Sequence, residues 1–227
     1  MFSSFKEAHD FVRAQRIELV DLLYCDLWGH LHHVTLSARE FTEEVMTEGV
    51  GFDGSSVGFK HVNAGDMVLI PDLSTSLVDP VHKQAALACL CSVYEADTKE
   101  LYQFVPREIA RRAENWMIST GIADKSLWGP EFESYIFDRI TLKNSPAYTL
   151  CQIDSGEANW GNLVNANGYA LPDNQAYQAA APCDNYYELR DEIVVTLEKL
   201  GIPVKYHHHE VGGPGQSEIE TPLLGIT

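Results

Sequence analysis

The sequence is poor in basic residues, with 16 Lys and Arg against 33 Asp and Glu, so its formal net charge is −17. A chain this acidic repels phosphate backbones and anionic lipids, which argues against nucleic acid or a membrane surface as a partner. The chain also lacks any apolar run near the roughly 20 residues of a membrane span. Its N-terminus has no basic start followed by an apolar stretch, so no secretory signal is visible. Carboxylates are abundant, and any cluster of them needs a neutralising partner such as a divalent cation.

Cysteine is scarce and scattered, at positions 25, 89, 91, 151 and 183. An odd and dispersed set does not build a disulfide framework, so we expect a cytoplasmic protein. Cys89 and Cys91 stand two residues apart in an apolar run. That spacing is typical of one face of a buried strand rather than of a metal site.

The first part of the chain predicts a small α+β domain in which a helix packs on a sheet. Ser4 with Glu7, and Ser37 with Glu40, are capping-box pairs that mark two helix starts. The expected elements are, in order, a helix through Phe11, hairpin strands at 17–26 and 31–36, a helix with Phe41, Val45 and Met46 on one face and Gly49 as its stop, and strands at 67–70 and 85–94.

Residues 51–59 contain three glycines and two serines, so the segment is not expected to form a comfortable strand or helix. Phe52 and Phe59 anchor its two ends. Two interpretations stay open: a surface loop without a role, or a loop that presents Asp53 to a ligand or partner.

A polar stretch at 96–103 predicts a domain boundary, which divides the chain into 1–103 and 104–227. Pro106 suits the first turn of a helix that Gly121 ends. Residues 144–181 show weak periodicity and predict a long loop, functional or disordered.

The last predicted helix begins after Asp184, which is expected to be its cap, and ends at Gly201 and Pro203. Its apolar stripe consists of Leu189, Ile193, Leu197 and Leu200.

Glu131 and Glu133 lie two residues apart in a predicted strand, so their side chains share one face. Tyr135 and Phe137 share that face, which favours a pocket with aromatic residues at its base. Solvated surface charge is the alternative explanation of these glutamates.

A second acidic segment begins with three histidines and turns at glycines 212, 213 and 215. A symmetric hairpin centred near position 214 places Glu210 directly opposite Glu218, and like charges that face each other destabilise a hairpin. A divalent cation between them removes that penalty, and oxygen ligands select Mg²⁺ or Mn²⁺. Zinc is the competing idea, but consecutive histidines alternate faces and cannot all reach one ion.

Three motifs together resemble bacterial type I glutamine synthetase: Phe52-Asp53-Gly54-Ser55-Ser56, Glu131-x-Glu133, and His207-His208-His209-Glu210 through Gln216-x-Glu218. The stretches 66–72 and Asp79-Pro80 are also similar to the amino-terminal domain of that family. The resemblance runs from about Ile17 to Glu220. It implies a β-grasp domain at 1–103 followed by the first part of an α/β catalytic domain at 104–227. It also implies a homo-oligomeric ring with each active site between neighbouring subunits.

The family carries two Mg²⁺ or Mn²⁺ ions in its active site. By resemblance, Glu133, Glu210 and Glu218 bind one ion and Glu131 contributes to the second. Asp53 and Ser56 belong to a loop that the neighbouring subunit inserts, where the aspartate helps to bind ammonium and take its proton. Lys205 and His208 correspond to the nucleotide side, although many members carry a glutamate at the position of Lys205.

The implied reaction forms glutamine from glutamate, ammonium and ATP through γ-glutamyl phosphate. Family members are roughly twice as long, so the resemblance implies a truncated chain that is inactive alone. Two alternatives stay open: a γ-glutamyl-amine ligase of the same superfamily, and a non-catalytic metal-binding or oligomerisation module.

Overall fold

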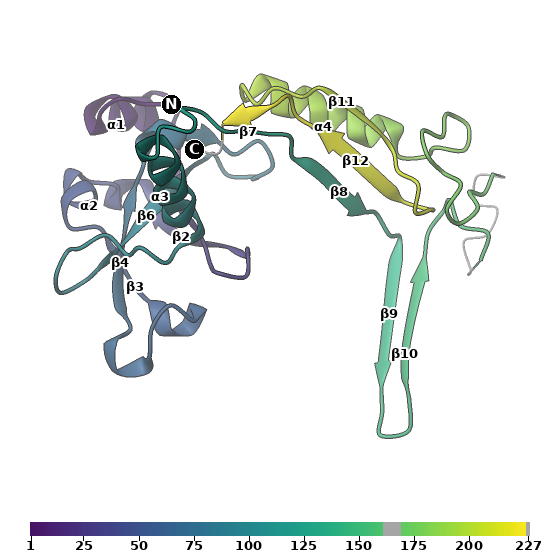
Figure 1. Ribbon diagram of the computed structural model, residues 1–227, viewed down its shortest axis with the longest axis horizontal. Coiled ribbons are helices and arrows are strands. Elements are labelled where there is room, and N and C mark those ends of the chain that lie inside the picture. The colour runs from purple at the N-terminus through teal and green to yellow at the C-terminus, as the bar shows by residue number, and fades with distance from the viewer. Residues whose placement is uncertain (161–168, 226–227) are drawn as a thin grey trace. The chain divides into compact units, whose positions relative to one another are not determined.

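The computed structural model describes residues 1–160 and 169–225 (Figure 1). It contains two compact units, residues 1–126 and residues 127–225, which we describe separately. The domain boundary expected after Gln103 stays a prediction, and helix α3 (Pro106–Ser119), which follows it, groups with the first unit. Within the described ranges, none of the helices has the length and apolar character to cross a membrane.

The first unit is built on a mixed sheet with the order β2-β1-β6-β4-β3, and β5 also pairs with β6. Its strands are β1 (Leu19–Cys25), β2 (Leu31–Ser37), β3 (Val50–Asp53), β4 (Asp66–Pro71), β5 (Leu77–Val78) and β6 (Ala86–Glu95). Strands β1 and β6 run parallel, and the other pairs are antiparallel. The strands expected at 17–26, 31–36, 67–70 and 85–94 are thereby confirmed, and Cys89 and Cys91 are buried on β6 as expected.

Helix α1 (Phe5–Ala14) packs on this sheet through Ala8 and Val12, which are buried in the same core as Val20 and Leu69. The Ser4 side chain accepts a hydrogen bond from Glu7 N at 3.3 Å, which confirms Ser4 as its cap.

The second capping box is wrong. The Ser37 side chain makes no cap bond, residues Ala38–Glu40 form one 3₁₀ turn (η1), and helix α2 is only Glu43–Thr47 with Thr42 before it. The reason is Phe41, whose backbone leaves the helical region at ψ 80° so that its ring is buried. That ring packs 5.3 Å from the Phe5 ring.

The segment 51–59 is also more regular than expected. Residues 50–53 form β3, with Phe52 opposite Met67 on β4, and Gly54–Val57 form a 3₁₀ turn (η2). A strand is favourable here because the centroids of the Phe52 and Tyr24 rings lie 4.8 Å apart, and the packing of these two rings outweighs the flexibility of the glycines.

The second unit contains a three-stranded antiparallel sheet with the order β11-β12-β8. These strands are β8 (Glu131–Tyr135), β11 (Tyr206–His209) and β12 (Gln216–Glu220), and helix α4 (Tyr187–Lys199) packs against β11 and β12. A two-stranded hairpin, β9 (Arg139–Asn144) with β10 (Thr149–Asp154), extends as a ribbon after β8 (Figure 1). The short strands β7 (Leu127–Trp128) and β13 (Leu224–Gly225) pair with each other.

Two expectations for this unit are corrected. Residues 149–154 form strand β10 inside the segment that was expected to be irregular, because each of these residues pairs with a residue of β9. Residues 161–168 of that segment lie outside the described residues. Asp184 does not cap α4, since Tyr186 stands at the cap and Asp184 instead binds the Arg190 guanidinium. The residue that α4 buries is Arg190, while Leu189 and Ile193 of the expected apolar stripe are exposed.

Candidate metal centre

One face of the β11-β12-β8 sheet gathers the acidic side chains. Glu218 on β12 lies opposite Glu133 on one side and His208 on the other. Glu220 lies likewise between Glu131 and Tyr206. Because residues directly opposite share a face, these side chains all project to the same side of the sheet.

The register of the β11–β12 hairpin differs from the expected one. Glu218 faces His208 rather than Glu210, which lies just beyond β11 with its backbone N–H bonded to the Gln216 carbonyl at 3.0 Å. The turn is centred one residue earlier than position 214, since Gln216 N bonds to the Gly213 carbonyl. A shift of two residues in pairing keeps each side chain on its face, so Glu210 still belongs to the acidic face.

Two groups of three ligand atoms lie within 4.8 Å of one another on this face: His208 with Glu210 and Glu218, and Glu131 with Glu218 and Glu220. In the first group, His208 Nδ1 lies 3.5 Å from Glu210 Oε2, and His208 Nε2 lies 3.7 Å from Glu218 Oε2. Glu210 Oε2 is buried and makes no hydrogen bond to the described residues. Burial and the neighbouring Glu210 carboxyl raise the pKa of Glu218 to about 7.

These observations fit a divalent cation. A buried carboxylate oxygen without a donor costs free energy, and a cation would both satisfy it and offset the repulsion between Glu210 and Glu218. Carboxylate oxygens with a single imidazole suit Mg²⁺ or Mn²⁺ better than zinc, which favours several nitrogen or sulfur ligands.

Glu133 is oriented by an amide. Gln216 Nε2 donates to Glu133 Oε2 at 2.9 Å, while Gln216 Oε1 accepts from Gly212 N at 2.6 Å. Tyr135 and Phe137 stack with ring centroids 5.6 Å apart. Glu133 lies on the expected face opposite Glu218, but it is exposed and bonded to Gln216, and it is in neither of the two groups of converging ligand atoms among the described residues.

Lys205 and Glu220 occupy the far end of this face. Lys205 Nζ lies 3.2 Å from Glu220 Oε2 and 4.5 Å from the centre of the Tyr206 ring, and the Tyr206 hydroxyl donates to Glu220 Oε1. The hydrogen bonds from Tyr206 and Lys205 lower the pKa of Glu220. Sequence reasoning missed Glu220, although its spacing from Glu218 places both on one strand face.

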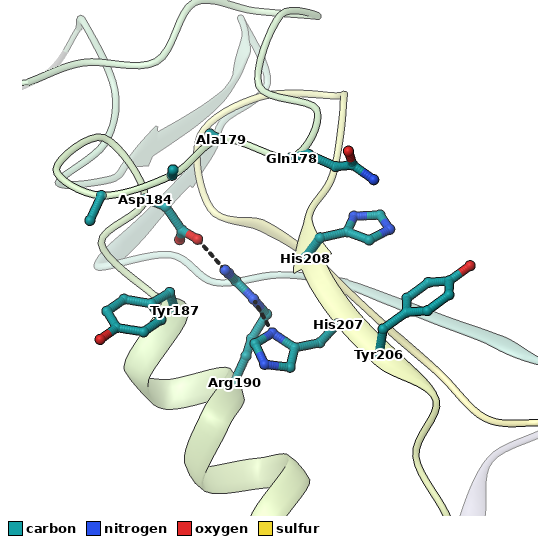
Figure 2. Close-up of a pocket in the computed structure, with 10 residues that line it drawn as sticks. Gln178, Ala179, Asp184, Tyr187, Arg190, Tyr206, His207 and His208 are labelled. Carbon is teal, nitrogen blue, oxygen red and sulfur yellow. Dashed lines mark hydrogen bonds and ion pairs between the residues drawn. The ribbon is translucent and has the colours of Figure 1, made fainter.

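The histidines divide between the two faces as expected. His208 faces the acids, with its ring stacked 5.8 Å from the Tyr206 ring. His207 accepts from Arg190 Nε at 3.3 Å, and in Figure 2 it turns toward Arg190 whereas His208 points away. Arg190, Tyr187 and His208 help to line a cavity of about 470 Å³.

The loop with Asp53 belongs to the first unit, whereas the glutamates of the acidic face belong to the second. Asp53 Oδ1 accepts from Ser55 N at 2.9 Å, and Oδ2 accepts from the Ser56 hydroxyl at 2.8 Å. Hydrogen bonds from Ser55 and Ser56 hold the pKa of Asp53 below its usual range. The structure therefore places Asp53 and Ser56 together, with Asp53 exposed and ionised.

Two successive parts of the chain match a class of protein in which a β-grasp domain precedes a catalytic domain, and the second match begins within the first compact unit. The family model described as "Glutamine synthetase, beta-Grasp domain" matches residues 16–96, and the model described as "Glutamine synthetase, catalytic domain" matches residues 103–224. The chain therefore belongs to the glutamine synthetase family, which confirms the resemblance and the fold class read from the sequence.

Three similar proteins show the range of the family. The chain is 37% identical to a glutamine synthetase of Aquifex aeolicus over 95% of its own length and 46% of the relative. It is 36% identical to a 3-hydroxylaminophenol mutase of Cupriavidus pinatubonensis over 97% of its length and 48% of the relative. A Plasmodium falciparum glutamine synthetase structure superposes with a TM-score of 0.85 at 22% identity, covering 99% of this chain and 45% of the other. The chain thus spans about half the length of the curated relatives it matches.

Proposed function

We propose that this chain carries the divalent-cation site of a glutamine synthetase, which joins ammonia to glutamate with ATP through γ-glutamyl phosphate. The observation that carries the proposal is the convergence of His208, Glu210 and Glu218 around a buried Glu210 oxygen that has no hydrogen-bond donor within the described part of the chain. Family membership supports the choice of reaction. Because the chain spans half of its relatives, we propose that these residues alone are inactive.

Each acid then has a role toward the cation. Glu133, Glu210 and Glu218 bind one Mg²⁺ or Mn²⁺ ion, and Glu131 contributes to a second. When bound, such ions neutralise the charge that develops on transferring phosphate groups. The protein's own part is to hold these carboxylates on one sheet face before the ion arrives, as the Gln216 bond to Glu133 does.

Asp53 and Ser56 are proposed to serve the ammonium half of the reaction from a neighbouring subunit of a ring-shaped oligomer. An ionised carboxylate both attracts ammonium and accepts its proton. The hydrogen bonds from Ser55 and Ser56 that keep Asp53 ionised support the attraction of ammonium to this carboxylate.

Lys205 and His208 are proposed to lie on the nucleotide side, with His208 at the edge of the cation site, where it also lies close to Glu210 and Glu218. Lys205 is already engaged with Glu220, so that carboxylate competes with a nucleotide for the charge of the Lys205 ammonium.

The identity of the amine substrate is also part of the proposal. A relative named as a mutase at 36% identity shows that similarity at this level does not fix the substrate. The exposed Asp53 loop, with a carboxylate prepared for a small cation, favours ammonium over a bulkier amine.

Calorimetric titration with Mn²⁺ tests the proposed site. Glu210→Ala removes the buried oxygen and is expected to weaken Mn²⁺ binding at least about tenfold. A loss of that size is typical when a metal ligand, or a group that orients one, is removed. Glu192→Ala removes an exposed acid of α4 and serves as the matched control, with unchanged affinity expected. Equal affinities in wild type and Glu210→Ala would sink the proposal.

A further inference from the structure

Glu157 is an ionisable residue that the proposed reaction does not use, and it is completely buried. Its carboxylate receives three hydrogen bonds: from Asn185 N to Oε1 at 2.7 Å, and to Oε2 from Gly215 N at 2.7 Å and from His209 Nε2 at 2.9 Å. A carboxylate with three donors is a strongly bonded anchor point.

The two partners of Oε2 flank the turn that carries the acids. His209 is the last residue of β11 and stands between His208 and Glu210. Gly215 directly precedes Gln216, whose side chain donates to Glu133. One buried oxygen thus ties both ends of the turn between β11 and β12.

The His209 ring carries this constraint on to Glu210. Its Nδ1 lies 2.9 Å from the Glu210 carbonyl oxygen, which can only accept, so Nδ1 donates. The ring is therefore fixed between Glu157 on one side and the Glu210 backbone on the other. The backbone of Glu210 is held where its carboxylate points to His208 and Glu218.

We propose that Glu157 is a positioning residue for the candidate metal centre, acting from below the acidic face through His209 and Gly215. The inference rests on the proposed function, since it assigns the support of that same cation site. Groups that orient metal ligands in this way change metal affinity by about 10- to 100-fold when removed. A merely structural role would instead lower stability and leave the affinity of the folded protein unchanged.

Asp154 provides the matched control for that distinction. It is a buried acid of the same unit, on β10, where its carboxylate lies 3.6 Å from Arg139 Nε and accepts from Gln152. Asp154→Asn therefore perturbs a buried carboxylate without touching the partners of Glu157.

The test compares Glu157→Gln with Asp154→Asn in the full 227-residue chain. Glutamine keeps the size of the side chain but replaces one acceptor oxygen by a donor, so a bond to Asn185 N or the pair to Gly215 and His209 is lost. Calorimetry with Mn²⁺ alone measures affinity, thermal unfolding measures stability, and hydrogen exchange by mass spectrometry measures protection of residues 210–216 without metal.

We expect Glu157→Gln to weaken Mn²⁺ binding at least about tenfold and to speed exchange across 210–216. Asp154→Asn should lower the unfolding temperature while leaving both quantities near wild type. Glu157→Leu removes both acceptor oxygens at a similar side-chain size, so equal Mn²⁺ affinity in Glu157→Leu and wild type, or an equal loss of affinity in the Glu157 and Asp154 variants, overturns the inference. The inference is also overturned if the Glu157 variant and the wild type show the same hydrogen exchange across residues 210–216, whether or not the wild type binds metal. A wild type that binds no Mn²⁺ instead overturns the proposed function.

Discussion

At the residue scale, buried carboxylates in this protein are held by several donors at once. Asp26, at the turn between β1 and β2, accepts from the backbone N–H groups of Trp28 and His30 at 2.8 and 2.9 Å. Its second oxygen lies 2.9 Å from His32 Nε2 and 3.1 Å from His30 Nδ1. The bond to His32, assisted by the backbone donors and opposed by burial, keeps the pKa of Asp26 well below its usual range.

The lowered pKa of Asp26 predicts a pH-dependent contribution to stability. A group whose folded pKa is depressed stabilises the fold above its unfolded value of about 4 and loses that contribution as the pH falls toward the folded value. Asp26→Asn should therefore be less stable than wild type at pH 7, and the difference should narrow as the pH falls below about 4. Urea unfolding from pH 7 to 3 measures this, with Asp10→Asn, an exposed acid of α1, as the control. A difference that stays constant with pH would contradict the assignment.

Residue-level prediction from the sequence succeeds where spacing alone decides the outcome. The alternation of a strand places Glu131 with Glu133, and separates His208 from its two neighbours, without any knowledge of the fold. Glu157 gave no such signal, because its role depends on contacts with residues 185, 209 and 215, which are distant in sequence.

At the scale of elements, the turn between β11 and β12 sets the geometry of the acidic face. Gly215 has φ +79° and donates to Glu157, while its carbonyl accepts from Ile136 N at 2.8 Å. A Cβ on Gly215 would collide with the Ile136 carbonyl oxygen. The turn thus lies against the end of β8 at backbone-to-backbone distance, which requires glycine.

Gly215→Ala is therefore expected to destabilise the second unit strongly. Gly201, after α4, has φ +80° but no atom of the described residues within 4 Å of its Cβ position, so Gly201→Ala reports the cost of the left-handed backbone alone. That cost should be about 1 kcal/mol. The collision should add at least about 2 kcal/mol for Gly215→Ala, as strain at a special backbone position does. Urea unfolding of both variants gives the two free energies, and equal values would show that the turn can move away from Ile136.

The sequence predicted which elements exist better than how they pair. The segments of β8, β11 and β12 were expected to be strands, and that expectation assigned their side chains to the correct faces. The pairing of Glu218 with His208, however, depends on where the turn closes. Several glycines in succession offer more than one such position. Ser37 failed as a cap for a comparable reason, because burial of Phe41 outweighed a local hydrogen bond.

At the scale of the whole molecule, the proposed roles are distributed over two units. Asp53 belongs to the first unit and Glu210 to the second. The family resemblance, rather than any pattern within one unit, suggested that they act together from neighbouring subunits. The relatives are about twice as long as this chain, so the relation between the two residues is tested in a complete enzyme that carries these 227 residues as one half.

In such an enzyme, Asp53→Asn keeps the side chain's shape and removes its charge. The kcat/KM for ammonium should fall by about 10²-fold, the range for loss of a positioned acid or base, while the KM values for glutamate and ATP change little. Asp72→Asn is the matched control, since Asp72 caps a 3₁₀ turn through Ser74 as Asp53 does through Ser55. An unchanged dependence on ammonium would assign Asp53 a role in loop structure only.

Mixing Asp53→Asn subunits with Glu210→Ala subunits then tests whether one active site is shared between two subunits. If each site combines Asp53 of one subunit with Glu210 of another, some sites in a mixed ring receive two intact residues, and activity absent from both parents returns.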